Sequence, residues 1–108
     1  MAVREQLIVS WQNRSGELAN VCRVLSDVGI NIEALATAEA GEYGAVRLVV
    51  DDVRMARAVF HKAQVAHTAI DVFVIELPNR AGSLADIAGR LSEEKINIEY
   101  FYSAVAPG

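Results

Sequence analysis

The sequence contains a single cysteine, Cys22, and has neither a long apolar run nor a cluster of basic residues. One cysteine excludes an internal disulfide and a cysteine-rich metal site. No stretch reaches the ~18 apolar residues of a transmembrane helix, and the first residues, MAVREQ, lack the apolar centre of a signal peptide. From these absences we expect a cytoplasmic protein without a membrane partner.

Positive charge is scarce as well, because ten Lys and Arg stand against fourteen Asp and Glu, for a net charge of −4. Nucleic-acid affinity comes mainly from clustered basic residues, so we expect no nucleic-acid partner. The one aromatic cluster is Tyr100-Phe101-Tyr102. Strand alternation would place Tyr100 and Tyr102 on one face, as in base-stacking sheets. The acidic charge favours packing against a partner, or lining a ligand cleft, instead.

Signatures of catalysis are missing too, since no P-loop, GxGxxG or Ser-His-Asp grouping occurs. His61 and His67 are not spaced to share a helix face, so we expect no metal and no cofactor. Cys22 falls on an apolar helix stripe and is expected in the core rather than as a nucleophile. The pair Asp51-Asp52 is expected to begin a helix. These features favour a protein that is not an enzyme.

An internal repeat is the most informative feature of the chain. Residues 13–35, NRSGELANVCRVLSDVGINIEAL, align without a gap to residues 79–101, NRAGSLADIAGRLSEEKINIEYF. Both copies begin with the pattern NRxGxLA, and both have INIE near their ends. Amphipathic helices share leucines by chance, but they rarely share both of these flanking patterns.

Each copy predicts a strand, a glycine-containing loop, a helix and a second strand. The first strands are expected at 6–11 and 72–77, where apolar residues alternate. In the helices apolar residues recur at helical spacing. Gly29 stands where the first helix would end in a left-handed residue, and Lys95 takes that place in the second copy.

Only the first copy is completed by further elements. Strands are predicted at 31–39, 45–50 and 68–71, with a helix after Asp51 or Asp52. The order βαββαβ predicts an α+β, ferredoxin-like antiparallel sheet with helices on one face, followed by a partial βαβ unit. We therefore expect a complete domain at 1–71 and a partial second domain at 72–108.

The second strand of the partial unit, residues 97–104, would have no neighbour within its own copy. In a ferredoxin-like sheet the third strand lies between the first and the second, and the second copy has no third strand. An unpaired apolar edge is a site of association. We expect this segment to pair with another chain or with an edge of the first domain.

These segments resemble the ACT domain family, and in particular small proteins made of two tandem ACT domains. The resemblance covers nearly the whole chain and is carried by residues 13–19, 29–32, 48–52, 78–85 and 96–100. The family usually has proline before the loop glycine, where this chain has Ser15 and Ala81. Glycine is the position with the strict backbone demand, so the departure is mild.

ACT domains typically bind small molecules, most often amino acids, and regulate metabolic enzymes or transcription factors. They commonly pair side by side into extended sheets with ligands at the interface. The resemblance therefore implies an amino-acid-binding regulatory protein that forms a homodimer or higher homo-oligomer through sheet edges. One alternative is a regulatory subunit or assembly module that docks on an amino-acid biosynthetic enzyme without a ligand of its own. Another is a small enzyme that uses the sheet as a scaffold.

An amino-acid ligand would need donors for its carboxylate and acceptors for its ammonium group. The turn before a helix offers free backbone N–H groups, which Gly16 and Gly82 leave accessible. Asparagine oxygens at the loops and at the starts of the next strands could accept from the ammonium. We expect loop and strand start to lie close together. The candidate ligand-binding residues are Asn13, Arg14, Ser15, Gly16, Glu17, Leu18, Asn31, Ile32, Asn79, Arg80, Ala81, Gly82, Ser83, Leu84, Asn97 and Ile98.

Each of these candidates also has a structural interpretation. The loop asparagines could only cap a helix, and those after the helices could only end the helix and start the strand. The loop arginines could engage a carboxylate or simply be solvated. The two loops also differ, because the first belongs to a complete domain. The second could form a site only if another chain supplied the missing surface.

Overall fold

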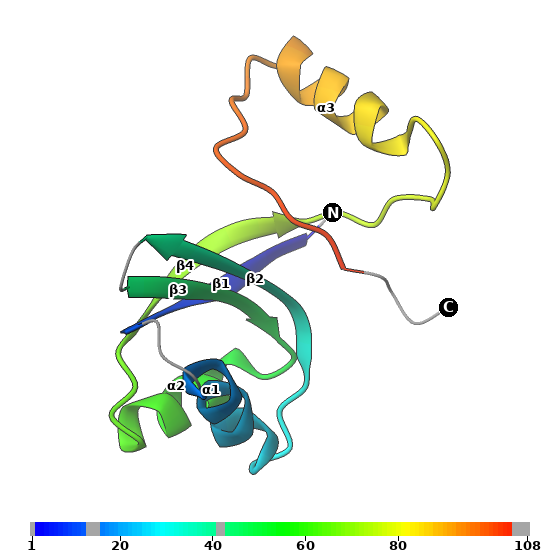
Figure 1. Ribbon diagram of the computed structural model, residues 1–108. Coiled ribbons are helices and arrows are strands. Elements are labelled where there is room, and N and C mark those ends of the chain that lie inside the picture. Colours follow the sequence, from blue (N-terminus) through cyan, green and yellow to red (C-terminus); the bar gives the residue numbers. More distant parts are fainter. Residues whose placement is uncertain (1, 13–15, 41–42, 105–108) are drawn as a thin grey trace.

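The chain folds around one four-stranded antiparallel sheet with strand order β2-β3-β1-β4. The computed structural model describes residues 2–12, 16–40 and 43–104 (Figure 1). Its strands are β1 (Ala2–Gln12), β2 (Ile32–Ala40), β3 (Tyr43–Val50) and β4 (His67–Val74), and its helices are α1 (Glu17–Ser26), α2 (Val53–Lys62) and α3 (Ser83–Glu93). The α+β, ferredoxin-like fold is confirmed, with β3 between β1 and β2.

The core lies between the sheet and helices α1 and α2, which cover one of its faces (Figure 1). Leu7 and Val9 reach it from β1 because alternate residues of a strand point to the same face. Leu25 of α1 and Phe60 of α2 fill it from the other side and are fully buried. Burying such side chains contributes roughly 1.5–3 kcal/mol each to folding.

The helix boundaries follow the sequence signals closely. Asp52 precedes α2, and its Oδ1 accepts a hydrogen bond from the Met55 N–H at 3.0 Å. Gly29, after α1, adopts the left-handed conformation with φ of 76°, as predicted. Lys95 adopts the same conformation after α3, with φ of 59°, although a left-handed residue other than glycine is strained. None of the described helices has the length and apolarity to cross a bilayer.

One continuous strand, β4, replaces the two strands predicted at 68–71 and 72–77. It runs from His67 to Val74 and pairs antiparallel with β1 as far as Ala2↔Val74. Residues 75–78 form no strand. The division into domains at residues 71 and 72 remains a prediction.

The predicted strand at 97–104 is also absent from the described part of the chain. This segment instead passes over the sheet on the face opposite α1 and α2 (Figure 1). It does not pair with either edge strand, so the predicted pairing with the first domain's edge is wrong for the single chain. Strand conformation requires a neighbour for the backbone N–H and C=O groups, and none is present here.

Helix α3 lies apart from the core of the first copy (Figure 1). Equivalent residues of the repeat show how differently the two copies are buried. Ile30 after α1 is 7% exposed, whereas its equivalent Ile96 after α3 is 52% exposed. Likewise Leu7 of β1 is fully buried, whereas its equivalent Phe73 is 69% exposed. The second copy therefore presents the apolar surface that the first copy buries.

Candidate functional site

Both candidate loops end in a glycine with the same unusual backbone conformation. Gly16 precedes α1 and Gly82 precedes α3, each with φ of 89°. Among the described residues, no side chain makes a hydrogen bond that caps the N-terminus of either helix. The first-turn N–H groups of a helix have no partner within the helix and carry a partial positive charge. Two similar backbone sites for an anionic group thus stand before α1 and α3.

These glycines should resist replacement for conformational reasons alone. A Cβ at Gly16 or Gly82 would meet no heavy atom within 4 Å. We therefore expect Gly16→Ala to lower the free energy of unfolding by about 1–2 kcal/mol, the cost of a left-handed alanine. Urea denaturation measures this change. Gly89→Ala is the control, since Gly89 lies inside α3 in open space and its replacement should stabilise by up to ~1 kcal/mol. Equal effects at both positions would contradict the prediction.

The second loop carries an unusual buried hydroxyl. Ser83, the first residue of α3, is 7% exposed, and its Oγ has no hydrogen-bond partner among the described residues. The N–H groups of Leu84 and Ala85 likewise find no acceptor there. Arg80 lies nearby but its guanidinium is exposed, with Nη2 at 3.7 Å from Asp86 Oδ2. Asn79, Ala81, Gly82 and Leu84 are exposed as well.

The first loop is described only from Gly16 onward, so the predicted site residues Asn13, Arg14 and Ser15 lie outside the described residues. Glu17 begins α1 and is half-buried, and Leu18 is partly exposed. The repeat places Glu17 where the second copy has Ser83. A carboxylate in the first turn would repel an anionic ligand, whereas a hydroxyl can donate to one. The second loop is thus the better anion site of the two.

The predicted proximity of loop and strand start within one copy is wrong. Asn31 precedes β2 and lies at the opposite end of α1 from Gly16, and ten helical residues rise about 15 Å. The Asn31 N–H instead donates to Asp51 Oδ1 at 3.1 Å, and its C=O accepts from the Asp51 N–H at 3.1 Å. Ile32, next to it, packs against the core. A ligand site that combines a loop glycine with such an asparagine must therefore take the loop from one copy of the repeat and the asparagine from another copy or another chain.

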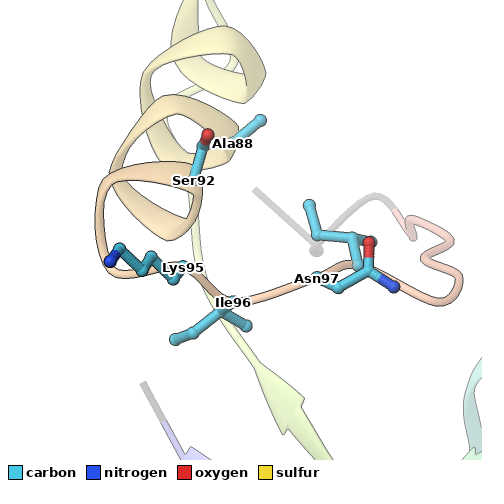
Figure 2. A pocket seen from close by; sticks show the side chains of 6 residues that line it. Ala88, Ser92, Lys95, Ile96 and Asn97 are labelled. Atoms are coloured by element: carbon cyan, nitrogen blue, oxygen red, sulfur yellow. The ribbon is translucent and has the colours of Figure 1, made fainter.

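Asn97 and Ile98 border a different feature, a concavity of about 440 Å³ beside the C-terminal end of α3. Figure 2 shows Ala88 and Ser92 on the helix, with Asn97 on the segment that follows. In the first copy the equivalent surface includes Ile30, which is buried against the core. The concavity therefore corresponds to interior surface of a completed module rather than to a finished pocket. Its lining residues are Ala88, Ser92, Lys95, Ile96, Asn97 and Ile98.

The described residues contain no group of three His, Cys, Asp or Glu side chains that could hold a metal ion. Sequence reasoning missed a different polar group, on the sheet face opposite α1 and α2. There Gln6 of β1 contacts Tyr100 and Tyr102, and Arg47 of β3 lies over the Tyr100 ring. Because Gln6 alternates with buried Leu7 and Val9, the sequence pattern alone assigned it no contact.

Comparison with known proteins agrees with this architecture. The family model described as an ACT domain pair matches residues 1–108. The crystal structure of protein BT0572 from Bacteroides thetaiotaomicron is 38% identical, with a TM-score of 0.91 over 96% of this chain and 72% of that one. The ligand-free regulatory subunit of aspartate kinase from Thermus thermophilus is 17% identical and shares the fold, with a TM-score of 0.67 over 95% of this chain and 80% of that one. No curated protein matches the sequence.

Proposed function

Because the chain belongs to the family of ACT domain pairs, we propose that it is a non-catalytic regulatory protein that binds an amino acid at the loops before its helices. The observation that carries the proposal is the pair of helix N-termini at Gly16 and Gly82, whose backbone donors no described side chain caps. A ligand carboxylate satisfies such donors and complements the helix dipole. The buried Ser83 hydroxyl adds a donor at the second loop.

The ammonium group of the ligand would be held by a second module. Asn31 and Asn97 each follow the C-terminal end of the helix that their loop precedes. Loop and asparagine therefore meet only across an interface between modules. This is the arrangement expected when modules associate side by side through their sheet edges, and we propose a homodimer or higher homo-oligomer of that kind. Occupancy would then be transmitted through the geometry of the interface.

A thermal-shift measurement with each of the twenty amino acids tests amino-acid binding. A ligand at a hundred times its dissociation constant should add ~2.7 kcal/mol to stability and raise the melting temperature clearly. Ser83→Ala should weaken binding by roughly fivefold, the value of one hydrogen bond. Ser10→Ala, which shortens an exposed serine of β1 away from the candidate loops, is the matched control and should bind as wild type does. No shift with any amino acid would contradict the proposal.

The exposed apolar surface of the second copy favours one other function, that of a regulatory subunit docking on an enzyme. Leu84 and Ile96 are both 52% exposed, and Ile30, the equivalent of Ile96 in the first copy, is 7% exposed. Exposed apolar side chains that gather on one surface mark interaction sites. The absence of any amino-acid effect, together with saturable binding to a purified biosynthetic enzyme, would support this second function.

A further inference from the structure

The sheet face opposite α1 and α2 holds the side-chain contacts that tie the second copy to the first. Gln6 lies there, fully buried although it is polar. Its Nε2 donates to the Tyr100 hydroxyl at 2.9 Å, and its Oε1 accepts from the Tyr102 hydroxyl at 2.7 Å. The guanidinium carbon of Arg47 lies 4.3 Å from the centre of the Tyr100 ring, a cation–π contact.

These two hydrogen bonds use both the N–H and the C=O of the Gln6 amide. They therefore form only when residues 97–104 lie in one particular register across the sheet. A buried amide must satisfy its donor and its acceptor, and each unmet group is costly. Tyr100 and Tyr102 are two residues apart, so they share a face of an extended segment and can reach the same amide together. Sliding the segment by one residue would turn both hydroxyls away and leave Gln6 buried without partners. Burial also raises the pKa of the Tyr102 phenol above its usual value, with the neighbouring Tyr100 adding to the rise.

The two copies of the repeat carry different residues at the positions of Tyr100 and Tyr102. By the repeat, Tyr100 and Tyr102 correspond to Ala34 and Ala36 of β2. Ala36 pairs with Arg47 in the sheet, and so lies beside the residue that contacts the Tyr100 ring. The first copy thus has alanine on the face where the second copy has tyrosine. Small side chains on one surface leave room for large ones on the other.

We propose that the open face of the first module's sheet is the docking surface for the second module of the same chain, and that Gln6 fixes the register in which residues 97–104 lie across it. The tyrosines of the second module pack over the alanine-bearing side of that face. The second module consequently meets the open sheet face of the first through residues 97–104, whereas α1 and α2 cover the opposite face. Docking of this kind does not depend on amino-acid binding.

The test uses the full chain labelled with 3-fluorotyrosine and observed by fluorine NMR without ligand. The chain has three tyrosines, so single Tyr→Phe variants assign every signal. In the wild type the Tyr100 and Tyr102 signals should lie away from the position of an exposed tyrosine. Gln6→Met should move both toward that position and leave the Tyr43 signal in place. Should Gln6→Met fail to fold, Tyr102→Phe, which leaves the sheet intact, should still shift the Tyr100 signal.

A pair of neighbouring residues on β2 provides the matched control. Ala36→Phe fills the space beside Arg47 and should release the tyrosines, whereas Thr37→Phe, exposed on the other face, should not. Signals of Tyr100 and Tyr102 that are already at the exposed position, or that ignore Gln6→Met in a folded protein, would overturn the proposal. Displaced signals that disappear on hundredfold dilution would assign the surface to a second copy of the chain and overturn it too.

Discussion

Leu25→Ala should lower the free energy of unfolding by about 2–5 kcal/mol, whereas Leu91→Ala in the dilute chain should cost about 1 kcal/mol or less. The two leucines occupy the same position of the repeat, in α1 and α3. Leu25 is fully buried and its removal leaves a cavity in the core. Leu91 is half-buried, so its methyl groups lose less on truncation and solvent fills the space.

Urea denaturation at low and high protein concentration measures both costs. Each variant is the other's control, since the same side chain is shortened within a similar helix and helix propensity cancels. If another copy covers α3, the cost of Leu91→Ala should grow with concentration while that of Leu25→Ala does not. Equal costs at the lowest concentration would mean that α3 is already packed in the single chain.

The sequence predicted the first copy well because its signals are local. Gly29 and Asp52 fulfil the roles expected of them, and the strand order follows from βαββαβ connectivity. Strand ends were harder, since the end of β4 depends on its pairing with β1, which lies far away in the sequence. The position of Asn31 was misjudged for a similar reason. Two segments that flank one helix lie at its opposite ends, a full helix length apart.

The contacts of Gln6 could not be predicted from the pattern of neighbouring residues. They join residues far apart in the sequence, and a polar residue that alternates with apolar ones is ordinarily solvated. One signal was nevertheless present in the repeat. Equivalent positions carry Ala34 and Ala36 in the first copy but Tyr100 and Tyr102 in the second. A change from small to large on one strand face indicates that the two copies cover that face differently.

The exposed apolar residues of the second copy predict that the chain associates with itself. Leu84→Glu should weaken self-association of the full chain by about a hundredfold, or ~2.7 kcal/mol. Leu84 is 52% exposed at the start of the apolar stripe of α3, and Ile96, which follows the other end of α3, is equally exposed. A carboxylate buried at an apolar contact loses hydration without gaining a partner. Sedimentation equilibrium over a range of concentrations measures the dissociation constant.

Ala85→Glu separates this effect from a change in net charge. It adds the same charge one residue further along α3, on an exposed position outside the apolar stripe, and should leave the dissociation constant nearly unchanged. A loss of association in both variants would indicate general charge repulsion rather than a contact through the stripe. A wild-type chain that stays monomeric at ~0.1 mM would contradict the prediction outright, because contacts that weak lie near the millimolar end of the affinity scale. The first copy supports this expectation, since Val21 and Leu25 on the apolar stripe of α1 are buried, whereas the equivalent residues on the stripe of α3 are only partly buried. A second chain that supplies comparable cover would bury the stripe in the same way.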